Sequence, residues 1–296
     1  MQAYSCQSCG GQINGMAETI ATTCPFCDNP VVILDKVEGD LRPDYVIPFQ
    51  ITKEEAKAAL SQFVTNKFLL PKVFKDEQHI DEIRGIYVPF WLFDAKAKVD
   101  GQYRTQTVRT WSDFHYSYTE VSHYLNVRSG EMAFEHLTVD GSSLLSDQLM
   151  QSIEPFDFSQ AVDFQTAYLA GYLADKYDVI ATAGQEIANE RIKQSATQQV
   201  RSTLAGMGHL TVESETVQLA DGQYHYALYP VWLLTTSWQG NRYTFAMNGQ
   251  TGRFVGDLPV DKATYWKAFA GMAIGVATVA FIVFYFLLNG LTGGSL

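Results

Sequence analysis

The stretch Ile86-Tyr-Val-Pro-Phe-Trp-Leu-Phe93 is an unbroken run of apolar and aromatic residues, which predicts a buried strand. Pro89 cannot donate a ladder hydrogen bond, so it favours a sheet edge or a bulge. The run is echoed by Leu228-Tyr-Pro-Val-Trp-Leu-Leu234, and a glycine follows each copy, at Gly101 and Gly240. Each copy is also preceded by a segment with a helical pattern. These features predict either a duplicated helix-plus-β-hairpin unit or two similar aromatic strands in one sheet.

Residues 37–260 are expected to form a mixed α+β body around these two runs, so the predicted fold class is α+β. Thr52 and Glu55 form a capping box, which predicts a helix that ends near Asn66. Further helices are expected over residues 144–153, 164–177 and 185–205, the last stopped by Gly206 and Gly208. Strands are expected at 46–49, at 103–110 pairing with 86–93, at 116–127, and at 224–238 pairing with 242–248, with a tight turn at Asn248-Gly249.

The four cysteines of the chain all lie near the N-terminus, as Cys6-Gln-Ser-Cys9 and Cys24-Pro-Phe-Cys27. Each pair turns two thiolates toward one point, and two such pairs complete a tetrahedral all-sulfur site of the structural zinc kind. The sequence therefore predicts a zinc ribbon over residues 1–36, with Zn²⁺ held by Cys6, Cys9, Cys24 and Cys27. An iron–sulfur-type thiolate site and disulfides are the alternatives.

The cysteine distribution also indicates a compartment. A disulfide-stapled secreted protein more often spreads its cysteines through the fold, whereas here 269 residues after Cys27 contain none. The first residues, MQAYSCQSCGG, have neither a basic nor an apolar leader segment, so no secretory signal is expected. The N-terminal body is therefore expected to be cytosolic and reduced.

An uncharged run of 21 residues, AFAGMAIGVATVAFIVFYFLL, occupies positions 268–288. About 20 apolar residues cross a hydrocarbon core, so residues 261–296 are expected to comprise a linker, one transmembrane helix and a short tail. A buried core helix is the alternative. Lys262 and Lys267 precede the run and no charge follows it, which by the positive-inside rule places the body in the cytoplasm and the C-terminus outside.

Gly271 and Gly275 lie four residues apart inside this run. Small residues at that spacing let two membrane helices pack closely, which would permit a homodimer through this face. Ordinary use of glycine in a membrane helix is the favoured explanation of the pair, and dimerisation is the alternative.

A search for catalytic motifs finds no P-loop, no G-x-S-x-G, no H-E-x-x-H and no cysteine outside the four, so no catalytic residue is predicted. Residues 131–190 carry eleven acidic side chains and one basic side chain, Lys176. Carboxylates of this region would have to meet in a pocket for acid–base chemistry, and an enzyme of that kind is one hypothesis. A solvated acidic face or an acidic docking surface is the other interpretation. His115 and His123, eight residues apart, are a weaker candidate for a second metal site.

The net charge of −11 lowers the expectation of nucleic-acid binding, because phosphate neutralisation by basic side chains supplies most of that affinity. Residues 1–36 contain three acidic side chains against Lys36, and a zinc centre with four thiolates adds two negative charges. These charges would repel phosphate, so no nucleic-acid partner is expected. A nucleic-acid-binding zinc ribbon linked to replication or transcription is kept only as an alternative hypothesis.

Several sequence segments resemble those of a known protein family. They are VIPFQITKEEAK, IYVPFWLFDA, VRTWSDFHYSYTE, DQLMQSIEPFDF, AYLAGYLADKYDV, ALYPVWLLTT and FAMNGQTGRFVGDLPVDK, together with the two cysteine pairs. The chain resembles the TFIIB-type zinc-ribbon-containing membrane proteins of Gram-positive bacteria, which include the YdjG-like proteins. Family members are sometimes labelled as a primosomal helicase, but this sequence has none of the ATPase motifs that such a label requires.

The resemblance implies the same four ligands and a place in a phage-shock-like membrane stress system. It further implies protein partners of the PspA type or of the virion-core-like, SPFH-related type. The functional hypothesis is a membrane-anchored adaptor that recruits cytosolic proteins to the inner face of the membrane.

Overall fold

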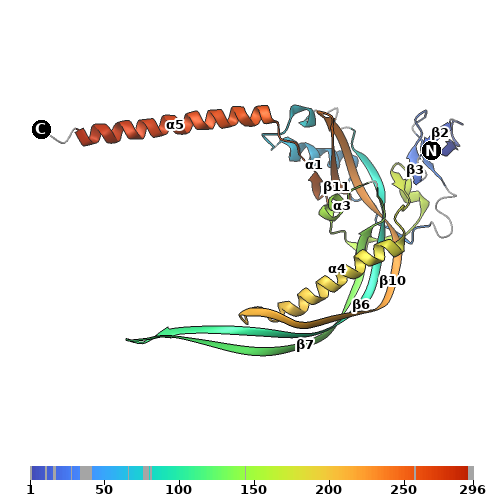
Figure 1. The fold of residues 1–296 in the computed structure, drawn as a ribbon. Coiled ribbons are helices and arrows are strands. Elements are labelled where there is room, and N and C mark those ends of the chain that lie inside the picture. Colours follow the sequence, from blue (N-terminus) through green and yellow to red (C-terminus); the bar gives the residue numbers. More distant parts are fainter. Residues whose placement is uncertain are drawn as a thin grey trace.

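The computed structural model describes residues 2–292, except 11, 16–17, 28, 34–41, 66, 76–79, 81, 144 and 257. Ten described strands form one mixed sheet, helices pack against it, and a long C-terminal helix leaves the body (Figure 1). The predicted α+β fold class is thereby confirmed, with a four-cysteine cluster at one end and one apolar helix at the other.

The two aromatic runs lie side by side at the centre of the sheet. They belong to β6 (Arg84–Ser112) and β10 (His209–Trp238), which pair antiparallel with Tyr87 opposite Pro230 and Pro89 opposite Leu228. Phe90 and Tyr229 stack with ring centroids 4.7 Å apart, and both are fully buried. Burial of each such side chain contributes about 1.5–3 kcal/mol, so these strands supply much of the core.

The prediction of an edge or a bulge at Pro89 is wrong, because β6 is a central strand with neighbours on both sides. At this residue β6 changes its neighbour. The strand β9 (Leu173–Asp175) pairs with Ile86 and Tyr87, whereas β7 (Ser117–Asp140) begins its pairing at Phe90. The carbonyl of Pro89 accepts from the Gly141 amide on that side at 2.9 Å, and the missing N–H falls in the gap between the two neighbours.

The expected pairing of 103–110 with 86–93 is also wrong, because both segments lie in the single 29-residue strand β6. Gly101 does not turn the chain. An added Cβ at this glycine would come within 2.4 Å of the hydroxyl of Tyr103, whose ring covers it. The predicted strand at 116–127 is confirmed as part of β7, and Tyr103 faces Asn126 across the ladder.

The second hairpin follows the prediction. The strand β10 pairs with β11 (Asn241–Asn248), and β11 pairs with β12 (Phe254–Gly256) after a tight turn. In that turn the side-chain oxygen of Asn248 accepts from the amides of Gln250 and Thr251, each at 2.9 Å.

Three of the four predicted helices of the body are present. The helix α1 (Lys53–Thr65) starts with the capping box, in which the Thr52 amide donates to a Glu55 carboxylate oxygen at 2.8 Å. That backbone hydrogen bond, with one from the Thr52 hydroxyl, lowers the pKa of Glu55. The others are α3 (Asp147–Ile153) and α4 (Ala181–Ser202), the latter followed by Gly206 and Gly208 with positive φ.

The helix expected at 164–177 is absent. Within 158–175 the structure has two single 3-10 turns, η4 (Phe158–Gln160) and η5 (Thr166–Leu169), and two short strands, β8 (Val162–Asp163) and β9. A further 3-10 turn, η3 (Lys72–Lys75), follows α1. The β9 segment pairs with β6 on one side and with an N-terminal strand on the other, and these ladders override its helical pattern.

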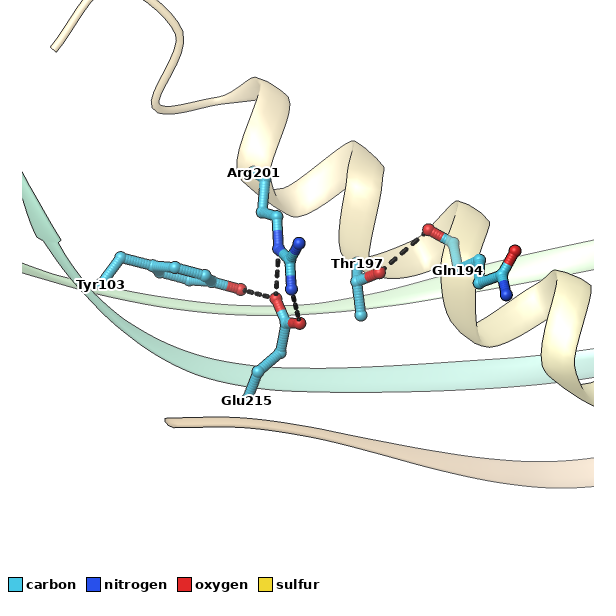
Figure 2. A network of polar contacts seen from close by, with 5 residues as sticks. All are labelled: Tyr103, Gln194, Thr197, Arg201 and Glu215. Atoms are coloured by element: carbon cyan, nitrogen blue, oxygen red, sulfur yellow. Dashed lines mark hydrogen bonds and ion pairs between the residues drawn. The ribbon is translucent and has the colours of Figure 1, made fainter. Parts of the chain in front are cut away.

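The helix α4 lies across the outer half of β6. Its buried residues Ile192, Ala196 and Val200 recur every four positions and pack on Val99 and Tyr103. Tyr103 donates its hydroxyl hydrogen to Glu215 of β10 at 2.5 Å, and the Arg201 guanidinium binds the same carboxylate from α4 (Figure 2). This network joins the end of the helix to both central strands.

Removal of the Tyr103 hydroxyl is expected to destabilise this region. Desolvation raises the pKa of Glu215, but hydrogen bonds from Arg201 and Tyr103 outweigh it, so the pKa lies below its ordinary value. A lowered pKa means that the stabilisation is present at neutral pH and is lost as the pH falls through the folded-state value. Tyr103→Phe should cost about 1–2 kcal/mol at pH 7 and less in acid.

Urea unfolding of the full chain in detergent at pH 7 and at acid pH measures this effect. Tyr118→Phe is the matched control, because its hydroxyl also donates to a carboxylate, that of Asp113, but in an exposed turn. Equal losses in the two variants would contradict a special role for the Tyr103 network.

Several contacts occur twice in equivalent places. The Trp91 indole donates to the Val179 carbonyl just before α4 at 2.8 Å, and the Trp232 indole donates to the Ile51 carbonyl just before α1 at 3.0 Å. The Gly249 amide donates to the Pro230 carbonyl at 2.8 Å, as Gly141 does to Pro89. The helix α1 is followed in the chain by β6 but starts against Trp232 of β10. The helix α4 is followed by β10 but starts against Trp91 of β6.

The short strands repeat the pattern. The strand β5 (Tyr45–Val46) runs parallel to β10 at Ala227 and Leu228, as β9 does to β6 at Ile86 and Tyr87. On its other edge β5 pairs with β8.

Candidate metal centre

The N-terminal residues form two hairpins, each closed by one cysteine pair. The strand β1 (Gln2–Ser5) pairs with β2 (Gln12–Gly15), and β3 (Thr19–Thr23) pairs with β4 (Pro30–Val32). In the first turn the Gly10 amide donates to the Cys6 carbonyl at 2.8 Å, and Gly10 has φ of +72°. That left-handed conformation suits glycine and lets the chain turn back around the cysteines.

The two turns bring all four predicted ligands together. The Sγ atoms of Cys6 and Cys27 are 3.8 Å apart, those of Cys9 and Cys24 are 3.6 Å apart, and all four lie within 4.8 Å of one another. Four sulfurs placed tetrahedrally at about 2.3 Å from a metal lie about 3.8 Å from each other. The four cysteines are not disulfide-bonded, and their geometry could hold a metal ion.

The pKa values of the Cys6 and Cys27 thiols are shifted in opposite directions. Backbone amides of Cys9 and Ser8 donate to the Cys6 sulfur and lower the pKa of that thiol to about 6. At Cys27 the Asn29 amide lowers the pKa, but desolvation and the neighbouring thiols outweigh it and raise the pKa to about 12. Four negative sulfurs at this distance repel one another, so a bound cation must displace protons and its affinity falls as the pH is lowered.

The metal-site region is joined to the body through its main chain. The strand β3 pairs antiparallel with β9, with Ala21 opposite Ala174, and the Lys176 amide donates to the Glu18 carbonyl at 2.8 Å. Ile20 is fully buried in the same core cluster as Trp91. The second hairpin, β3–β4, therefore extends the central sheet beyond β9, whereas β1 and β2 form a separate two-stranded sheet.

A cleft of about 740 Å³ lies where the N-terminal hairpins meet the body. Thr23, Cys24 and Pro25 line one wall, and Lys53 of α1 and Arg84 of β6 are among the residues that line the other. Sequence reasoning missed this cleft, because its walls come from segments far apart in the chain.

The acidic residues of 131–190 are spread over several elements. Asp140 and Glu154 line one small cavity of about 80 Å³, where the Arg191 guanidinium lies 3.7 Å from the Glu154 carboxylate. Asp178 accepts hydrogen bonds from Ser143, and Asp157 caps a 3-10 turn. His115 lies in the turn after β6 and His123 within β7. In the described part of the chain, the four cysteines form the one group of three or more metal-binding side chains close enough to share an ion.

The helix α5 (Lys262–Thr292) contains the predicted membrane segment. Residues 262–284 form a segment that is long and apolar enough to cross a membrane, with a mean hydropathy of 2.0. The apolar part of this segment is not buried against the body. Open space surrounds the Cα atoms of Gly271 and Gly275, so this face is accessible to a second helix.

The chain is similar to a known bacterial protein over most of its length. The chain is 34% identical over 244 residues to a protein of Bacillus subtilis (strain 168) named uncharacterized protein YdjG, covering 82% of this chain and 72% of the relative. No family model matches the chain, and no solved structure matches it. The identity and the coverage show that this chain belongs to the family of YdjG-like proteins.

Proposed function

We propose that the chain is a membrane-anchored zinc-ribbon adaptor, which recruits cytosolic proteins to the inner face of the membrane. The observation that carries this proposal is the cleft shared by the N-terminal hairpins and the body. Because Cys24 lines the cleft and is also a candidate metal ligand, the shape of this surface depends on the metal site. The hairpins lie at the end of the body opposite α5, so they project away from the proposed membrane (Figure 1).

Zinc is the metal that we propose for the site. Four thiolates leave no open coordination position, which is typical of structural rather than catalytic zinc. Metal would stabilise two short hairpins that hold only a small core, formed by Cys6, Ile13 and Cys24.

Protein partners suit the exposed surface of the hairpins better than nucleic acid does. Phe26 is 68% exposed, and the described residues of 2–33 include no Lys or Arg that could bind phosphate. By family resemblance we propose PspA-type or SPFH-related partners. Self-association through Gly271 and Gly275 is a further proposal, supported by the open face of α5.

The proposed topology has the body in the cytoplasm and the C-terminus outside. It is supported by Lys262 and Lys267 at the start of α5 and by free cysteines that a reducing compartment would preserve.

A pull-down from detergent-solubilised membranes tests the adaptor role. Arg84→Glu reverses a charge in the cleft without touching a metal ligand, and Lys98→Glu makes the same change on β6 outside the cleft. We expect a PspA-type or SPFH-related protein to be recovered with the Lys98 variant and lost with the Arg84 variant. Recovery of the same proteins with both variants would count against a partner that binds in the cleft.

We also infer that the body arose from two copies of one unit. The proposed units are β5–α1–β6–β7 and β9–α4–β10–β11, and in both the helix begins eight residues after the start of the short strand. The paired tryptophan, proline and glycine contacts support this proposal, with the two helices exchanged between units. An experimental structure superposed on itself should align the two units, and a poor fit of α1 on α4 would contradict the duplication.

A further inference from the structure

The strand β9 is shorter than the two strands that flank it. It begins at Leu173, whereas β6 extends back to Arg84 and β3 extends forward to Thr23. Because β9 is parallel to β6 and antiparallel to β3, both extensions run past the same end of β9. Neighbouring strands lie about 4.8 Å apart, so strands that flank a third are about 9.6 Å apart. The sheet therefore contains a slot ahead of Leu173 that is as wide as one extended chain.

This slot, between Gly85 of β6 and Thr23 of β3, opens into the cleft of about 740 Å³, which both residues line. The chain ahead of β9 does not fill the slot. Gly171 has φ of +87°, and the Tyr172 amide donates to the Leu169 carbonyl at 3.1 Å within its own turn. The main chain thus leaves the sheet at the point where its two neighbours continue.

Backbone groups of both neighbours face the slot. The Cys24 amide donates toward β4, to the Asn29 carbonyl at 2.9 Å, and successive residues of a strand point their backbone groups to opposite sides, so those of Thr23 face the slot. The Pro89 carbonyl accepts on the side of β6 away from β10, and the same alternation turns the Gly85 amide to that side. Among the described residues, neither amide has a hydrogen-bond acceptor there.

The corresponding position beside β5 is filled by the chain itself. Tyr45 lies opposite Ala227 of β10, as Leu173 lies opposite Ile86 of β6. Ahead of Tyr45 the chain stays in the sheet, because Asp44 bonds the strands on both sides.

The contacts of Asp44 show what such a position requires. Its amide donates to the Tyr226 carbonyl at 2.7 Å, and its carbonyl accepts from the Phe164 amide at 3.0 Å. Its carboxylate accepts from the Tyr226 amide at 2.8 Å. Gly85 occupies on β6 the place that Tyr226 occupies on β10, so an extended segment with a carboxylate would satisfy its amide in the same way.

The charges around the slot also favour an acidic segment. Lys53 and Arg84 line the cleft, and both are exposed. In the described part of the chain, neither side chain forms a hydrogen bond or an ion pair, and Glu54 is the one acidic residue of the lining. An incoming carboxylate would therefore meet two cations that have no other partner there.

We propose that the slot binds an extended, acidic segment of a partner protein by β-strand addition, ahead of β9 and between β6 and β3. Main-chain hydrogen bonds supply affinity in this mode of recognition, and the side chains supply specificity. The inference rests on the adaptor role proposed above and names the kind of segment that the cleft takes.

Selection from phage-displayed random octapeptides tests the proposal. The target is the full chain, purified in detergent with zinc, and enriched peptides are synthesised with a fluorophore for anisotropy measurements. We expect enriched sequences to contain Asp or Glu. Methylation of each peptide amide in turn should weaken binding about tenfold in at least one central position, because it removes a backbone hydrogen bond.

Charge reversal in the protein supplies the second measurement. Arg84→Glu should weaken binding of the acidic peptides about tenfold, because it replaces attraction by repulsion. Lys98→Glu, the same change on β6 outside the cleft, should leave binding unchanged. Equal zinc content in both variants shows that the hairpins are intact.

The remaining outcomes separate strand addition from the adaptor role. Absence of enriched peptides, peptides without acidic residues, or binding that tolerates every methylated amide would overturn strand addition. If the pull-down nevertheless loses its partner with Arg84→Glu, the adaptor role stands and its partner binds the cleft in another way. Enriched acidic peptides without any partner in the pull-down would support the slot and count against recruitment.

Discussion

Cys24→Ser is expected to abolish stoichiometric zinc binding and to unfold the N-terminal hairpins. Cys24 is fully buried, and its sulfur lies 3.6 Å from that of Cys9, within the four-thiol cluster. Structural zinc sites of this type contribute an apparent 10–16 kcal/mol or so at neutral pH, far more than the small core of two hairpins can replace. Zinc content per chain and limited proteolysis of residues 1–36 measure the two effects.

The adjacent substitution Thr23→Ser is the matched control, since it keeps all four thiols and should retain the metal. The body should stay folded in the Cys24 variant, because three of its core clusters contain no residue of the hairpins. One equivalent of zinc retained by the serine variant would contradict the assignment of Cys24 as a ligand.

Two arginines within α5 are expected to release the chain from the membrane. Ile274 and Val279 lie inside the apolar segment, and neither is covered by the body. An arginine near the centre of a membrane helix costs about 2.5–3.5 kcal/mol, so Ile274→Arg with Val279→Arg should cost about twice that. The measurement is the fraction of chain that resists alkaline extraction from membranes.

Leucine at the same two positions is the control, because it preserves length and hydrophobicity. The leucine variant should remain in the membrane fraction, and the arginine variant should appear in the extract. If the arginine variant stayed fully resistant to extraction, α5 would not be the membrane anchor.

The elements that the sequence predicted well are those encoded by neighbouring residues. The capping box at Thr52 and Glu55, the turn at Asn248-Gly249 and the stop of α4 before Gly206 each depend on a few adjacent side chains. The predictions that are wrong involve partners far along the chain. Pro89 looked unsuited to a central strand because its neighbours β7 and β9 could not be foreseen, and the helical pattern of 164–177 gave way to pairing with β6 and β3.

The candidate site divides in the same way. Two C-x₂-C pairs were sufficient to predict the four-thiol cluster, because the turn within each pair is set by adjacent residues. The uncharged run of 21 residues was sufficient to predict a helix long enough to cross a bilayer, because helix length is also a local property. Only the tertiary structure decided that β3 joins the body sheet at β9, that the cleft forms between the hairpins and the body, and that the short β9 leaves a slot in the sheet. The physical reason is that strand pairing depends on residues distant in sequence, which local periodicity does not specify.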